Sequence, residues 1–96
     1  MSNTKKFPCP CCGFLTLDEE PPGTHDICPV CFWEDDYVQF LSPHLDGGAN
    51  STNLIEARQN FVKIGVSEEQ FKVYVRPPLP HEFPSSEVED NEELPE

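Results

Sequence analysis

Two C-x-x-C pairs, separated by fifteen residues, constrain this 96-residue chain more than any other feature. The first pair is Cys9 and Cys12, and the second is Cys28 and Cys31. A C-x-x-C turn brings two sulfurs to the same side of a tight loop, and two such turns supply the four thiolates of a tetrahedral zinc site. The spacing therefore predicts a metal site formed by these four cysteines.

The residues around each pair favour the tight turn, or knuckle, that such a site requires. Pro10 and Pro29 follow the first cysteine of each pair and pre-set its φ angle. Gly13 follows the first pair, where glycine adopts a positive φ easily. Phe32 occupies the equivalent position after the second pair, so the second knuckle either closes differently or strains a non-glycine residue.

Other uses of the cysteines are less well supported. Disulfides would leave one of five cysteines unpaired, and the start MSNTKKFPC lacks the apolar run of a signal peptide, which predicts a reducing, cytoplasmic location. Thioredoxin-like chemistry lacks the βαβ unit that it needs. Iron remains the alternative to Zn²⁺, because a rubredoxin-like site uses the same four thiolates.

Cys11 is the fifth cysteine and lies inside the first knuckle. One interpretation is a buried or half-buried thiol that packs beside the metal site. A second is a reactive thiol with a lowered pKa. A third is a ligand that exchanges with Cys9 or Cys12, and the sequence leaves all three open.

Composition limits both the core and the partners. Eleven prolines and 36% hydrophobic residues predict a small core that needs a metal as a staple. The net charge of −12 argues against binding to nucleic acid or to anionic membranes, and no segment is apolar enough to span a membrane. A basic protein partner fits this charge better. The sequence does not determine the oligomeric state.

The elements expected around the knuckles are short strands. Residues 14–17 (FLTL) predict one strand, and residues 24–28 predict a second that pairs back on it as a hairpin. Residues 32–40 predict a third strand with an irregular start.

Two helices are expected after the strands. Asn53 and Glu56 resemble a capping box, Gly65 ends the apolar periodicity, and residues 53–64 therefore predict the main helix. A short second helix is predicted at about residues 68–72. The expected fold is α+β: a small zinc-ribbon-like hairpin or three-stranded sheet with two cysteine knuckles, packed on these helices.

The sequence divides into three parts. Residues 1–6 form an N-terminal extension, and residues 7–79 form the predicted domain. Residues 80–96 contain seven acidic residues and no Lys or Arg, which predicts a disordered acidic tail.

An acidic run follows the second knuckle and offers a candidate site for a hard metal or a basic partner. Three adjacent carboxylates on a strand cannot all face one ion, so a solvated acidic loop is the preferred interpretation. A metal-dependent enzyme would also need an open coordination position, which a closed tetrathiolate lacks. Its candidate residues are Glu34, Asp35, Asp36, His44 and Asp46.

Several motifs together resemble the bacterial cysteine-rich CPCC domain. They lie at Phe7–Gly13, Pro21–Asp36 and Gly47–Gly65, followed by Val75-Arg76-Pro77. The resemblance implies metal binding through Cys9, Cys12, Cys28 and Cys31, and it supplies no enzymatic activity.

The sequence therefore predicts a zinc-stabilised, non-enzymatic protein-interaction module. The first alternative is a rubredoxin-like iron protein or a thiol redox protein. A metal-dependent enzyme, or an acidic inhibitor of a basic nuclease or toxin, is a further alternative.

Overall fold

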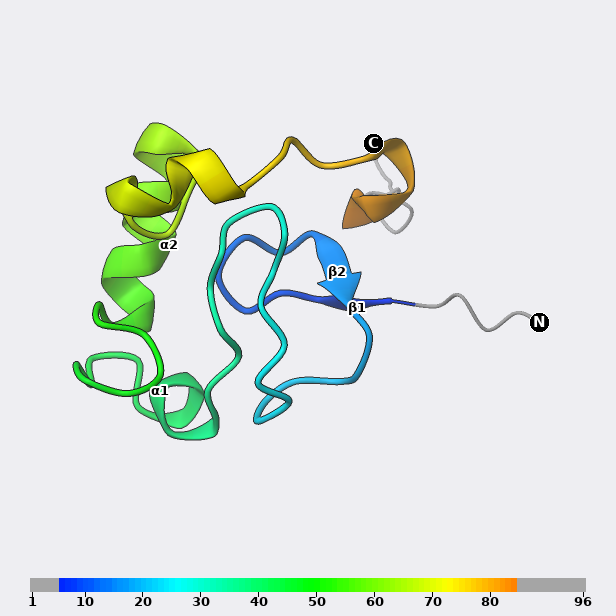
Figure 1. Ribbon diagram of the computed structural model, residues 1–96. Helices are drawn as coiled ribbons and strands as arrows, with labels where there is room; N and C mark the ends of the chain where they lie inside the picture. Colours follow the sequence, from blue (N-terminus) through cyan, green and yellow to red (C-terminus); the bar gives the residue numbers. More distant parts are fainter. Residues whose placement is uncertain (1–5, 85–96) are drawn as a thin grey trace, which may run out of the picture.

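The computed structural model describes residues 6–84. A two-stranded antiparallel hairpin and a second loop lie in the middle of the molecule, with most of the helices on one side and the last, short helix (orange) on the other (Figure 1). In chain order the elements are β1 (Phe7–Pro8), β2 (Leu15–Leu17), α1 (Tyr37–Leu41), α2 (Leu54–Ile64) and the 3₁₀ helices η1 (Glu69–Tyr74) and η2 (Pro80–Glu82).

The first knuckle is the turn of the β1–β2 hairpin. Phe7 lies opposite Leu17 and Pro8 opposite Leu15 across the antiparallel pair. The amide of Cys9 donates to the carbonyl of Phe14 at 2.9 Å, which closes the loop that carries the first cysteine pair. The strand predicted in residues 14–17 is confirmed over Leu15–Leu17, and its partner β1 was not predicted.

The second knuckle is also a chain reversal, between residues 25–28 and residues 33–35. The amide of Cys28 donates to the carbonyl of Trp33 at 3.0 Å, and an isolated antiparallel bridge joins Ile27 to Glu34. The predicted pairing of residues 24–28 with residues 14–17 is therefore wrong. Each C-x-x-C turn reverses the chain, so the segments on its two sides pair with each other.

The third strand predicted over residues 32–40 is also wrong, because its second half is the helix α1. Asp36 caps this helix by accepting a hydrogen bond from the amide of Gln39 at 2.9 Å. The part of the chain described here therefore contains a two-stranded sheet and not a three-stranded one.

A single buried side chain organises the loop between α1 and α2. Gln39 donates through Nε2 to the carbonyls of Leu45, Asn50 and Thr52 at 3.0 to 3.2 Å. Its Oε1 accepts from the amide and the side chain of Asn50. Gly48 lies so close that a Cβ there would be 2.6 Å from the Gln39 amide carbon, so this position requires glycine.

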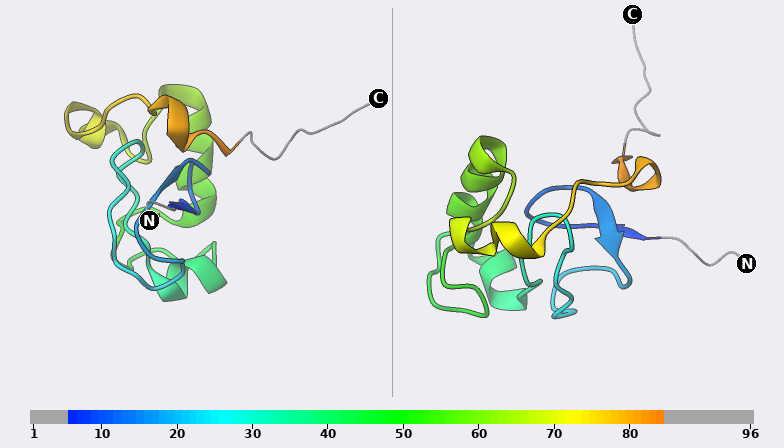
Figure 2. Two further views of the ribbon diagram at one scale, coloured as in Figure 1. Left: turned by 90° about the vertical axis from the view of Figure 1, so that its right-hand side faces the viewer. Right: turned by 45° about the horizontal axis from the view of Figure 1, so that its top comes forward.

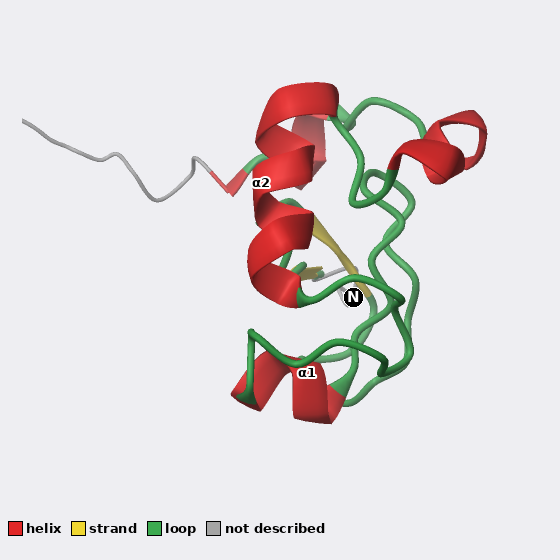
Figure 3. Ribbon diagram, turned by 90° about the vertical axis from the view of Figure 1, so that its left-hand side faces the viewer, coloured by secondary structure: helices red, strands yellow, loops and turns green. Residues whose placement is uncertain are grey.

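The main helix α2 forms where the sequence predicts it. Asn53 accepts a hydrogen bond from the amide of Glu56 at 2.8 Å, and Gly65 ends the helix with a φ of +80°. Leu54 and Ala57 are buried against the core. Figure 3 shows α1 below the N-terminal end of α2.

The core is small and is built around the cysteines. Its buried apolar members come from both knuckles, from β2 and α2, and from the residue that follows the second knuckle. They are Cys9, Cys11, Leu17, Cys28, Val30, Cys31, Trp33, Leu54 and Ala57.

The segment after η1 returns across the molecule toward β2 (Figure 2). Here η1 is a 3₁₀ helix in the region where the sequence predicts a short second helix. Residues 80–82, which the sequence assigns to the tail, form η2. Phe83 then packs edge-to-face on Phe14, with ring centroids 5.0 Å apart. The rest of the predicted tail, residues 85–96, and residues 1–5 lie outside the described residues.

Candidate metal centre

The sulfurs of Cys9, Cys12, Cys28 and Cys31 all lie within 4.8 Å of one another. Two of the sulfur–sulfur distances are 3.6 Å (Cys9 to Cys31) and 3.7 Å (Cys12 to Cys28). A tetrahedron with Zn–S bonds of about 2.3 Å has edges of about 3.8 Å. The four sulfurs therefore fit one tetrahedral ion, and within residues 6–84 no other group of three or more potential ligands is placed to hold a metal.

Each knuckle directs a backbone amide at the sulfur of its first cysteine. The amide of Cys11 donates to Cys9 Sγ, and the amide of Val30 donates to Cys28 Sγ, both at 3.4 Å. These bonds spread the negative charge that a thiolate carries when it binds a metal.

Both knuckles close through the same hydrogen bond and the same backbone conformation. The amide of Gly13 donates to the carbonyl of Cys9, and the amide of Phe32 donates to the carbonyl of Cys28, each at 2.8 Å. The φ angles are +83° at Gly13 and +69° at Phe32. A non-glycine residue in this region costs about 1–2 kcal/mol, so the second knuckle is the strained one.

The side chain of Phe32 compensates for this strain through contacts with η1. Its ring centroid lies 4.5 Å from that of Phe71 and 5.4 Å from that of Tyr74. Such aromatic pairs contribute about 0.5–1.5 kcal/mol each beyond their buried area. The strained turn is therefore coupled to the docking of η1.

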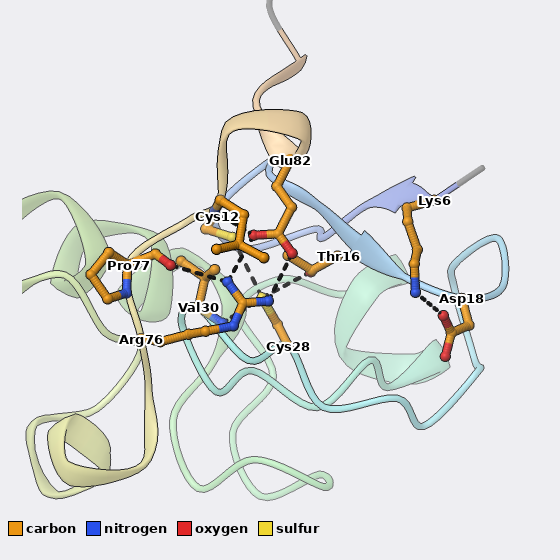
Figure 4. Close-up of polar contacts among 10 residues, drawn as sticks. Lys6, Cys12, Thr16, Asp18, Cys28, Val30, Arg76, Pro77 and Glu82 are labelled. Carbon is orange, nitrogen blue, oxygen red and sulfur yellow. Dashed lines mark hydrogen bonds and ion pairs between the residues drawn. The ribbon is translucent and has the colours of Figure 1, made fainter. Parts of the chain in front are cut away.

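The surroundings of Cys28 stabilise its sulfur as a thiolate. Its pKa lies below the ordinary value because Cys12 donates a hydrogen bond to it, with smaller contributions that include Cys31, Cys9 and Thr16. The Thr16 hydroxyl donates to Cys28 Sγ at 3.0 Å (Figure 4). In contrast, the pKa of Cys31 is raised, first by its interaction with Cys11.

Cys11 lies outside the group of four but beside it. It is buried in the core with Cys9, Cys28 and Cys31, whereas Cys12 is half-buried. The structure thus places Cys11 next to the candidate metal centre but outside the group of four sulfurs that could hold an ion.

An ion pair between two residues of the C-terminal segment, Arg76 and Glu82, lies against the second knuckle. The amide of Arg76 donates to the carbonyl of Pro29 at 3.1 Å, and its guanidinium makes a bidentate pair with Glu82 at 2.9 and 2.8 Å. Glu82 is only 5% exposed, and the Arg76 hydrogen bond holds its pKa below the ordinary value. Figure 4 shows this pair beside the Thr16–Cys28 contact.

Sequence reasoning missed this pair because Glu82 was counted among the residues of an acidic tail. The available signal was the Val75-Arg76-Pro77 motif, because it contains an arginine. An arginine next to a group of thiolates offsets the negative charge of that group.

The three adjacent acids after the second knuckle have separate structural roles. Asp35 is buried and accepts from the amide of Thr24 at 2.9 Å, while Asp36 caps α1. Glu34 lies 3.4 Å from the ring of His25. The run therefore forms neither a shared metal site nor a uniformly solvated loop.

The remaining candidates of the enzyme hypothesis lie in the loop after α1. His44 and Asp46 are both exposed, and Asp46 accepts a hydrogen bond from Asn53. In the described part of the chain they do not join Glu34, Asp35 or Asp36 in a ligand group.

The fold and the four-sulfur group define a small cysteine-rich protein with the features of a metal-binding protein. The sequence model of the cysteine-rich CPCC family matches residues 7–82, which include Arg76 and Glu82. The chain belongs to this family. No curated protein matches the sequence. None of the helices in residues 6–84 has the length and apolar character needed to cross a membrane.

Proposed function

We propose that this protein is a zinc-stabilised, non-enzymatic module that binds a protein partner. The observation that carries the proposal is the closed set of four sulfurs, three of them buried, at distances that fit one tetrahedral ion. Structural zinc sites have four protein ligands, whereas catalytic sites keep one position open for water or substrate. In this interpretation the metal supplies folding free energy and takes no part in chemistry.

The surface supports binding more than catalysis. The hollow between α2 and the segment after η1 has a volume of about 400 Å³, and its lining contains Lys72 and Arg76 but no carboxylate or histidine. Large apolar side chains are exposed elsewhere, including Tyr37 and Leu41 on α1 and Val73 on η1. Exposed apolar groups of this kind favour contact with another protein.

The charge and the cysteines indicate the kind of partner and compartment. A net charge of −12 favours a basic protein and disfavours nucleic acid. None of the five cysteines, which all lie within residues 6–84, forms a disulfide, and this fits a reducing cytosol.

Metal analysis of protein purified without added metal tests the proposal. We expect one zinc per chain, no visible absorption, and the same result for Cys11→Ser. Iron with charge-transfer bands would instead make this a rubredoxin-like electron-transfer protein.

Metal removal tests the structural role directly. A chelator should abolish the near-ultraviolet circular dichroism of Trp33, and stoichiometric zinc should restore it, because binding and folding are coupled in such sites. A folded protein that retains this signal without metal would contradict the proposal.

A further inference from the structure

A pocket of about 80 Å³ lies beside the second knuckle, between residues 27–34, the loop before α2, and the start of η1. Its walls combine apolar side chains (Ile27, Phe32 and Phe71) with two carboxylates (Glu34 and Glu68). Pockets for small-molecule ligands usually measure about 300–1,000 Å³, so this volume suits a single side chain.

Glu68 is the unusual group in this wall, because it is a buried acid without a cation. The residue is 8% exposed, and its Oε1 accepts from two neutral donors, Ser51 Oγ and Gln70 Nε2, both at 2.7 Å. None of the ion pairs formed within residues 6–84 includes it. A buried carboxylate without a countercharge is costly, so this wall favours an incoming cation.

The aromatic side of the pocket favours the same kind of ligand. The Phe32 ring stacks on Tyr74 and packs at a tilt against Phe71, and Tyr74 is 65% exposed beside them. Aromatic faces attract cations, and a planar guanidinium stacks on them especially well.

The backbone strain at Phe32 is a further observation that favours a ligand-binding site at this surface. The first knuckle uses glycine for the same positive φ, so phenylalanine is not needed to close a turn of this kind. Strained residues of this type persist where the surrounding structure holds them, and they concentrate at ligand-binding sites.

We propose that this pocket receives an arginine side chain from a partner protein. The guanidinium lies against the rings of Phe32 and Phe71, with Tyr74 stacked on Phe32 next to them, and donates hydrogen bonds to Glu68. Arginine fits better than lysine because its planar fork can stack and pair with a carboxylate at once. This inference rests on the proposed function and adds the place and the chemistry of the interaction.

Nuclear magnetic resonance of the zinc-loaded, ¹⁵N-labelled full chain tests the proposal. The probe is a capped pentapeptide with one central arginine between two leucines and terminal glycines, and its twin carries neutral citrulline instead. We expect the arginine peptide to shift the amides of Ser51, Glu68 and Phe71, and the citrulline peptide to leave them in place. A lysine peptide should bind more weakly.

Three variants separate the pocket from the general negative charge. Glu68→Gln keeps the acceptor for Ser51 and should weaken binding by about tenfold or more, because a buried charge pair is lost. Tyr74→Ala should also weaken it, without removing a buried group. Glu19→Gln removes the same unit of charge in an exposed loop and should leave binding unchanged.

The outcomes distinguish this inference from the proposed function. Shifts located elsewhere, equal binding of the citrulline or lysine peptide, equal effects of Glu68→Gln and Glu19→Gln, or no binding at all would each overturn the arginine pocket. None of these results would alter the metal content or the metal-dependent fold, which test the proposed function separately.

Discussion

The two cysteine knuckles have nearly the same backbone but differ at two of their five residues, CPCCG against CPVCF. Both have the proline, the amide-to-sulfur bond and the positive φ at the last position. Cys11 in the first knuckle corresponds to Val30 in the second, and Gly13 corresponds to Phe32. The comparison teaches that the four-sulfur arrangement goes with a shared turn, whereas the side chains at the third and fifth positions differ and make different contacts.

The knuckles also differ in how the rest of the chain holds them. Arg58 Nε donates to the carbonyl of Pro10 in the first knuckle at 2.9 Å. The second knuckle is held from more directions: its carbonyls accept from the amides of Ser67 and Arg76. Its sulfur Cys28 also accepts from the hydroxyl of Thr16. The second knuckle is therefore the better anchored of the two.

The largest expected difference between the knuckles concerns the ligands. Cys28→Ser should abolish metal binding and folding, because it removes the sulfur that Thr16 and Val30 support. Cys12→Ser removes a half-buried sulfur and should leave a weaker site. We expect zinc affinity, measured by competition with a chromophoric chelator, to differ by at least about tenfold between the variants. Equal losses would show that the anchoring does not affect the site.

The next largest effect is expected when the ion pair between Arg76 and Glu82, which lies against the second knuckle, is removed. Glu82→Gln should lower the free energy of unfolding by about 2 kcal/mol at pH 7, since a hydrogen-bonded charge is lost. The Glu82 pKa is lower in the fold than its ordinary value of 4.5, so its contribution is complete above pH 4.5 and disappears as the pH falls through the lowered pKa.

Urea unfolding at several pH values measures this difference. The thiolates lose metal in acid in both proteins, so the gap between wild type and variant is the relevant quantity at each pH. It should shrink below pH 4.5, whereas the control Glu19→Gln should show a small gap throughout. A gap that grows in acid would contradict the assigned ion pair.

A substitution at Gly13, the fifth position of the first knuckle, measures the free-energy cost of a positive φ without other effects. A Cβ added at Gly13 meets no atom within 4 Å, so Gly13→Ala introduces backbone strain without a clash. We expect a loss of about 1–2 kcal/mol in the free energy of unfolding. A neutral result would mean that the strain at Phe32 is also negligible.

The smallest effect is expected at the third position. Cys11→Val gives the first knuckle the residue found in the second, and it should change the stability by less than about 1 kcal/mol. One metal per chain should remain, as measured by elemental analysis. Loss of the metal would show that Cys11 is a ligand.

Features with local signals could be predicted from the sequence. The four cysteines were found by spacing alone, and α2 was found because Asn53 and Gly65 mark its ends within the segment itself. These signals act over three to four residues and do not depend on the rest of the fold.

Short elements and the contacts of the C-terminal segment were missed. The strands are only two and three residues long, too short for alternation to show their partners, and five-residue α1 is too short for helical periodicity. Glu82 lies in a segment whose composition resembles disorder, and only its pairing with Arg76 distinguishes it. The grouping of the four cysteines was therefore predictable from the sequence, but the surroundings of the group were not.

The amide of Gln39 has a consequence for how this chain can vary. The Gln39 side chain satisfies backbone groups of the loop before α2 that would otherwise need a neighbouring strand. It donates to three backbone carbonyls and accepts from one backbone amide. An acceptor-only side chain at position 39 would leave those carbonyls without a donor. Gln39, Gly48 and Asn50 thus form one interlocked unit, and we expect a change at any member to destabilise the loop unless another member changes with it.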